Sequence, residues 1–116
     1  MTVVLTGTGV KFETSKNLVV VGNVSASSDA RLKSNIRTIE SAVEKVCGMR
    51  GVYFTKDGSN GVGVIAQEVE AVIPEAVFDD DKGYKSVAYG NLVGVLIEAI
   101  KELKSEVEVL KGSQHK

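Results

Sequence analysis

The chain has 116 residues, of which 43% are hydrophobic and 25% charged, and its formal net charge at pH 7 is −1. This length allows one domain or a short segment attached to one, and the balanced charge excludes the basic surface that nucleic-acid binding requires. No apolar run is long enough to cross a membrane, and the single cysteine excludes a disulfide framework or a multi-cysteine zinc site.

Residues 1–27 differ in character from the rest. Short β-branched runs at residues 3–5, 10–12 and 18–21 are separated by Gly, Thr and Asn. This pattern predicts strands joined by turns. The strands are too few for an independent sheet. We therefore expect the end of a longer β-rich body, or a piece that packs against copies of itself.

Residues 27–33 read Ser-Ser-Asp-Ala-Arg-Leu-Lys. A Ser-Asp pair before a short turn is most often a helix start, with Ser28 or Asp29 as the cap. The alternative interpretation is that Ser28 is a nucleophile, that Lys33 is its base, and that the Ser27–Ser28 peptide bond is the substrate. The local sequence leaves both interpretations open.

Helical spacing begins after this segment. Steps of three, four and three residues place four side chains on one face: Ile36, Ile39, Val43 and Val46. Thr38 is expected to cap this helix, and Gly48 fits the position after its end. Cys47 falls in the apolar pattern and is expected in the core.

A hairpin and a helix should follow. Alternating residues 50–56, the turn signal at 57–61 and a partner strand at 62–65 predict the hairpin. Residues 66–73 predict a two-turn helix that Pro74 stops.

A second small hairpin is expected where residues 76–78 and 86–89 flank the acidic turn 79–83. The three aspartates of this turn lack the ligand spacing of a calcium loop. We expect no metal site and no cofactor.

One long helix is predicted over about residues 90–111, before a frayed tail at 112–116 that includes the only histidine, His115. Its apolar residues alternate steps of three and four and form a heptad seam: Val93, Leu96, Ile100, Leu103, Val107 and Leu110. Glu106 and Lys111 flank the seam at positions suited to an interchain ion pair. Near Ile97 and Ala99 a wide apolar stripe also fits packing on the chain's own domain. Beyond Leu103 only a partner helix would cover the seam.

These features form an ordered set. Along the chain they are Ser-Asp-x-Arg-x-Lys, Val-Tyr-Phe before a Gly-rich turn, Gly-Val-Ile-Ala-Gln-Glu-Val-Glu, Ile-Pro-Glu-Ala-Val, Tyr-x-x-Val-x-Tyr-x-x-Leu and Ala-Ile-Lys-Glu-Leu. The set resembles the C-terminal intramolecular chaperone domain of phage endosialidases, tailspikes and tail fibres, which also occurs in myelin regulatory factor proteins. The resemblance covers Ser28 to about Leu110. It makes residues 1–27 the end of a β-rich fibre stalk and residues 28–116 the chaperone domain.

The resemblance implies an α+β fold: a β-rich stalk end, then short helices and small hairpins, then a long helix in a parallel trimeric coiled-coil bundle. The partners would be two further copies and the chain's own upstream stalk, with no nucleic acid or membrane. Assembly would occur in the host cytoplasm, and the stalk would remain in the virion tail after the chaperone part is released.

The resemblance also implies self-cleavage of the Ser27–Ser28 bond, with Ser28 as nucleophile and Lys33 as base. Asp29 and Arg31 match further motif positions, and we infer that they hold the geometry. Two other residues, Gln67 and Glu68, match a second motif.

A serine hydroxyl needs a base, and a lysine serves as one only when its pKa falls from about 10.4 toward 7–8, through burial or a nearby positive charge. Arg31 could supply the charge, and trimer closure the burial. Ser28 and Lys33 must meet through a turn or across chains, because their spacing is off-face for a straight helix. Cleavage is therefore expected to follow assembly.

Two rival interpretations remain. One is a non-cleaving trimerisation module in which Ser28 only caps a turn. The other is a coiled-coil adaptor that binds a partner helix along residues 93–110.

Overall fold

The computed structural model describes residues 2–114, which form two units, residues 2–36 and residues 37–114. The first unit contains one element, the 3-10 turn η1 (Ala30–Leu32), and its residues are exposed throughout. The strands expected before residue 27 are absent from this unit, so that prediction is wrong for a single copy. Strands need paired backbone groups, and no second strand is present here to pair with them.

The second unit begins with a shorter helix than expected. Helix α1 spans Ala42–Cys47, and Ser41 before it has a left-handed φ of 53°. The expected start at Thr38 is therefore wrong, and Ile36 and Ile39 precede the helix. β-branched residues are weak helix formers, and α1 takes its N-terminal cap from another element, as described below. Gly48 follows the helix end as predicted.

The first hairpin is confirmed, with a tighter turn than expected. Strands β1 (Val52–Lys56) and β2 (Ser59–Gly63) pair antiparallel, with Val52 opposite Gly63. The turn is only Asp57 and Gly58, both with positive φ, as a two-residue hairpin turn of this type requires. The partner strand therefore begins at Ser59 rather than at residue 62.

Helix α2 (Ala66–Val72) ends before Pro74, which opens the 3-10 turn η2 (Pro74–Ala76), as predicted. The second hairpin is also confirmed, with β3 (Val77–Asp79) antiparallel to β4 (Lys85–Val87). In its acidic turn, one Asp80 carboxylate oxygen accepts hydrogen bonds from the backbone N–H groups of Lys82 and Tyr84. That carboxylate therefore closes the turn.

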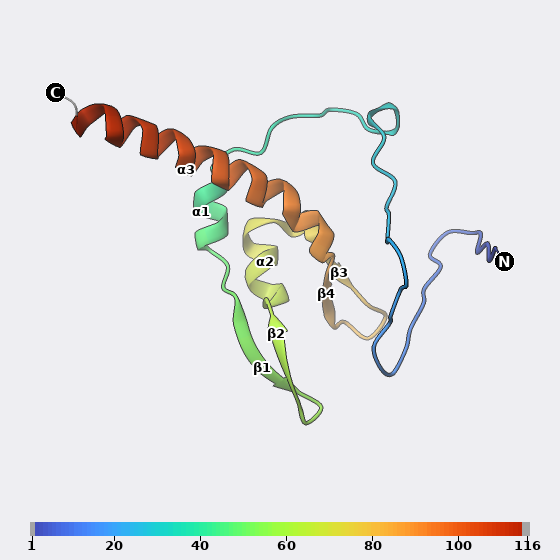
Figure 1. The fold of residues 1–116 in the computed structure, drawn as a ribbon. Helices are drawn as coiled ribbons and strands as arrows, with labels where there is room; N and C mark the ends of the chain where they lie inside the picture. Colours follow the sequence, from blue (N-terminus) through green and yellow to red (C-terminus); the bar gives the residue numbers. More distant parts are fainter. Residues whose placement is uncertain (1, 115–116) are drawn as a thin grey trace. The chain divides into compact units, whose positions relative to one another are not determined.

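The long helix, α3 (Val93–Gln114), follows the 3-10 turn η3 (Tyr89–Leu92). Residues 112–114 are helical, so the expected frayed tail is wrong for them, and His115 lies outside the described residues. Figure 1 shows α3 running past α1 and projecting beyond it. None of the helices in residues 2–114 is long and apolar enough to cross a membrane.

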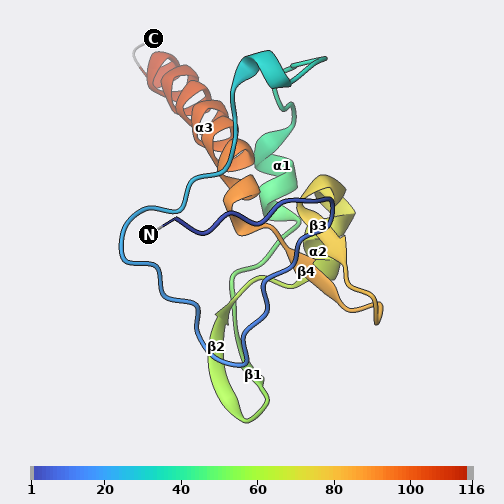
Figure 2. The same cartoon turned by 90° about the vertical axis from the view of Figure 1, so that its right-hand side faces the viewer.

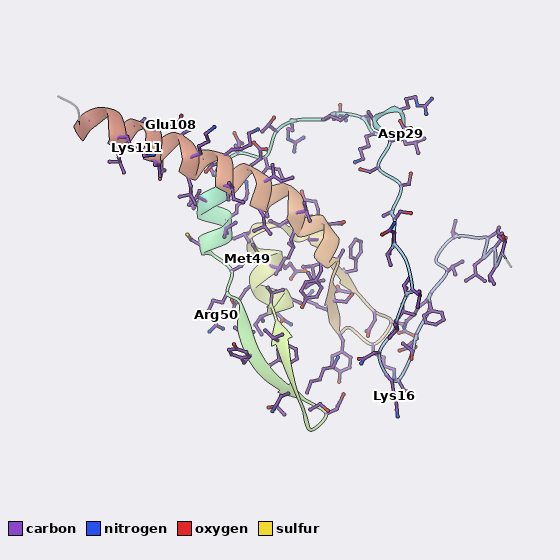
Figure 3. The ribbon with its side chains drawn as sticks, viewed as in Figure 1. Lys16, Asp29, Met49, Arg50, Glu108 and Lys111 are labelled. Carbon is purple, nitrogen blue, oxygen red and sulfur yellow. The ribbon has the colours of Figure 1, made fainter. Side chains whose placement is uncertain are left out.

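The core consists of two small clusters. Ala42, Val95 and Ala99 join α1 to α3, and Val69, Ala76 and Leu92 join α2 to the turns η2 and η3. Met49, in the connection between α1 and β1 (Figure 3), packs against both clusters. In Figure 2, turned by 90° from Figure 1, α1 again lies against α3.

Cys47 is exposed, contrary to the expectation that it belongs to the core. It follows Val46, which packs against α3, and one helical step turns the next side chain by about 100°. The side chain of Cys47 therefore leaves the α3-facing side of α1.

Candidate functional site

The candidate site is the turn that follows Ser28. The Asp29 carboxylate accepts a hydrogen bond from the backbone N–H of Arg31 at 2.8 Å, which makes Asp29 the N-cap of η1. Two backbone bonds complete the turn, from Leu32 N–H to the Asp29 carbonyl and from Lys33 N–H to the Ala30 carbonyl. The cap predicted from local sequence therefore exists, and it is Asp29 rather than Ser28.

The turn brings the Lys33 side chain back to Ser28. The Lys33 Nζ donates a hydrogen bond to the Ser28 Oγ at 2.7 Å. The two residues meet within one chain and through a turn, which was one of the two arrangements that their spacing allowed. This is the hydrogen-bonded contact that a nucleophile and its base require.

Arg31 is engaged by Asp29. The guanidinium Nη2 lies 2.8 Å from Asp29 Oδ2, and Nε lies 3.1 Å from Asp29 Oδ1. The Arg31 side chain, followed by its backbone N–H, holds the pKa of the Asp29 carboxyl below its usual value, and the same pair raises the pKa of Arg31. Arg31 was expected to add positive charge beside Lys33, but Asp29 balances that charge.

The site is open to solvent. Every side chain of residues 27–33 is exposed (the Asp29 label in Figure 3 marks the turn). In the contact at Ser28 the ammonium donates, whereas a base must accept the serine proton. The single chain thus brings Lys33 Nζ and Ser28 Oγ together in surroundings that are open to solvent.

Gln67 and Glu68 lie on α2, in the second unit. Gln67 is exposed. Glu68 receives the Arg50 guanidinium, with Nη2 2.6 Å and Nε 3.1 Å from its carboxylate oxygens. The Arg50 hydrogen bonds lower the pKa of Glu68. This pair ties the start of the first hairpin to α2, so Glu68 has a structural contact of its own (Figure 3 labels Arg50).

Nothing in the sequence pattern indicated the role of Glu102. From α3, its two carboxylate oxygens accept hydrogen bonds from the first backbone N–H groups of α1, at 2.7 Å from Ala42 and 3.1 Å from Val43. These backbone bonds, Val43 first, lower the pKa of Glu102. Only the folded contact between α1 and α3 reveals this cap, since Ser41 occupies the usual capping position and makes no side-chain cap.

Helix α3 has two apolar faces. One packs within the chain, where Val95 and Ala99 contact α1 and Glu102, one helical turn further on the same side, caps it. The predicted seam lies on the other face, and all six of its side chains are exposed, from 45% for Leu96 to 67% for Ile100. Ile97 is exposed as well, so the inner stripe is centred on Val95 and Ala99 rather than on Ile97. The seam has no cover within residues 2–114.

Known proteins match the site together with the helices that follow it in the sequence. Residues 28–78 match the family model described as chaperone of endosialidase. The Long tail fiber protein Gp37 of Enterobacteria phage T2 is 38% identical over 101 residues, covering 78% of this chain and 8% of that protein. The Gp37 of Enterobacteria phage M1 is 34% identical over 96 residues, covering 72% of this chain and 38% of that protein. The chain thus spans less than half the length of these relatives.

Proposed function

Residues 28–78 belong to the chaperone of endosialidase family, and from this premise we propose that the chain is a trimerisation and folding chaperone for a phage tail fibre or tailspike. In this proposal residues 1–27 are the end of the stalk, and residues 28–116 remove themselves by cutting the Ser27–Ser28 bond. The family and the tail fibre relatives support the assembly role. The hydrogen bond between Lys33 and Ser28 is the observation that carries the cleavage step.

The reaction uses the chain's own residues. Ser28 Oγ loses its proton to the uncharged Lys33 amine and attacks the Ser27 carbonyl carbon. The C–N bond breaks, the proton moves to the departing Ser28 nitrogen, and the Ser27 acyl group is held as an ester on Ser28 Oγ. Water then hydrolyses the ester to give a Ser27 carboxylate and a free Ser28 α-amine. Each chain cuts once.

The exposed seam supports the trimer. Val93, Ile100 and Val107 recur at one heptad position, and three leucines recur at the other. Each large apolar side chain moved fully out of water contributes about 1.5–3 kcal/mol. The intrachain core is small, with Val69 and Val95 as its largest fully buried side chains. Covering the seam with further copies adds the core that a single copy lacks.

Cleavage should follow assembly. The amine of Lys33 must lose its proton to act as a base, and removal from water favours the uncharged form. Exposure of the site in one copy therefore keeps the uncut chain intact until neighbouring copies cover it. This order would keep the chaperone domain attached until the stalk segments of the three copies are aligned with one another.

Intact-mass spectrometry of the purified wild-type chain beside Ser28→Ala tests the proposal. The wild type should yield fragments 1–27 and 28–116, and Ser28→Ala should remain full length. Light scattering on the same samples should give three copies in both. A wild-type trimer that stays uncut would instead indicate the non-cleaving trimerisation module, which the solvent-open Lys33 of this structure favours as second candidate. A stable monomer would favour the adaptor.

A further inference from the structure

Helix α1 depends on α3 for its first turn. At six residues α1 is far shorter than a helix that is stable by itself in water. Ser41 adopts a left-handed conformation and gives no side-chain cap. Both carboxylate oxygens of Glu102 supply that cap instead, while Ala42 is fully buried against α3. Glu102 and the Ala42 contact therefore fix where α1 begins.

Glu102 also stands next to the seam. Ile100 and Leu103, on either side of it in sequence, are exposed seam residues, at 67% and 47%. A partner that covers this seam would contact the turn of α3 that carries Glu102. On the other side of the cap, residues 34–41 connect α1 directly to Lys33. The Glu102 carboxylate thus connects two features: the exposed seam of α3 beside it, and α1, which residues 34–41 join to Lys33.

We propose that Glu102 is a positioning residue that transmits assembly of the α3 seam to α1, and through residues 34–41 to the Ser28–Lys33 pair. This inference rests on the proposed function. Glu102 touches neither reacting residue. The cap is already present in one copy. Its part in this proposal is to hold α1, and hence the point from which residues 34–41 leave the domain, more firmly once partners hold α3.

Amide hydrogen exchange at Ala42 and Val43 tests the link. Glu102→Ala should raise exchange at both amides at least about tenfold, since charge-assisted hydrogen bonds are lost. Glu108→Ala is the matched control, because Glu108 lies on the same helix and, among residues 2–114, forms its ion pair with Lys104, at 3.8 Å. Leu103→Ser, which weakens the seam, should raise exchange in the wild type but add little in Glu102→Ala. Independent, additive effects would overturn the link.

Cleavage per assembled trimer provides the functional readout. Glu102→Ala should assemble and cut at least about tenfold more slowly than wild type, and Glu102→Gln, which keeps one acceptor oxygen, should recover part of the rate. Equal rates in wild type and Glu102→Ala trimers would overturn the positioning role while leaving the proposed function intact. A wild-type trimer that is never cut would overturn both, and the Ser28→Ala comparison identifies that case.

Discussion

The Lys33 Nζ lies 2.7 Å from the Ser28 Oγ, across a turn of a single chain that is open to solvent. The contact is made by local structure alone, since Asp29 caps the turn and two backbone hydrogen bonds close it. Nothing in residues 2–36 buries the lysine. Local sequence therefore sets the distance between Lys33 Nζ and Ser28 Oγ, whereas burial of the pair would depend on what later covers it.

The variant Lys33→Arg distinguishes two roles of Lys33: accepting the Ser28 proton and holding Ser28 by a hydrogen bond. Arginine still donates to Ser28 but stays protonated, so it cannot accept the serine proton. We expect both Lys33→Arg and Lys33→Ala to slow cleavage by about 10²–10⁴-fold, measured as full-length chain remaining by intact mass. Cleavage of Lys33→Arg at close to the wild-type rate would show that Lys33 only orients Ser28.

Two substitutions at Asp29 distinguish its role as the cap of η1 from its ion pair with Arg31. Asparagine caps about as well as aspartate but carries no charge, and exposed ion pairs contribute little. Asp29→Asn should cut at nearly the wild-type rate, while Asp29→Ala should cut about tenfold more slowly, because the turn that returns Lys33 to Ser28 loses its cap. Time courses of fragment 28–116 measure both. Equal slowing would assign the effect to the lost charge.

Sequence periodicity predicted the elements that satisfy themselves locally. The Asp57-Gly58 turn, the stop at Pro74 and the length of α3 depend on nearby residues, and the structure has them within a few positions. The Ser28–Lys33 contact could be anticipated as far as requiring a turn. The sequence pattern did not say that Asp29 would build that turn.

The errors concern elements that depend on distant or absent partners. Thr38 was expected to cap α1, but the cap comes from Glu102, about sixty positions away, and Ser41 takes a conformation that no periodicity indicates. The strands before residue 27 need neighbours that a single copy does not supply. Val21 and Phe12 in that segment are exposed in the single copy.

The seam can be tested with two valines two positions apart. Val107 lies on the predicted seam, and Val109 lies off it; both are exposed in the single chain, at 47% and 69%. Val107→Ser should weaken the proposed trimer by roughly tenfold or more per subunit contact, because an apolar group that partner helices would bury is replaced by a hydroxyl. Val109→Ser should leave it unchanged. Light scattering across a dilution series measures both, and equal losses would place the interface elsewhere on α3.

Gly63 marks a close approach between the first hairpin and Tyr89. A Cβ at residue 63 would lie 2.6 Å from the Tyr89 hydroxyl oxygen, which itself lies 3.4 Å from the Val64 nitrogen. Gly63→Ala should therefore destabilise the domain by about 1–3 kcal/mol through overpacking. Gly51→Ala is the control, as a Cβ there meets nothing within 4 Å. Thermal unfolding of both variants checks this, and equal melting temperatures would contradict the close approach.

Acid should weaken the α1 cap. Backbone hydrogen bonds from Val43 and Ala42 hold the folded-state pKa of Glu102 below its ordinary value of 4.5. A carboxyl with a depressed folded pKa contributes its full stabilisation above the unfolded pKa and loses it as the pH falls through the folded value. The stability difference between wild type and Glu102→Gln should therefore be constant from pH 7 down to about 5 and shrink below about 4.5. Denaturant unfolding at each pH measures the difference, with Glu108→Gln as the matched control on the same helix. A difference that stays constant to pH 3 would mean that the Glu102 charge does not stabilise α1.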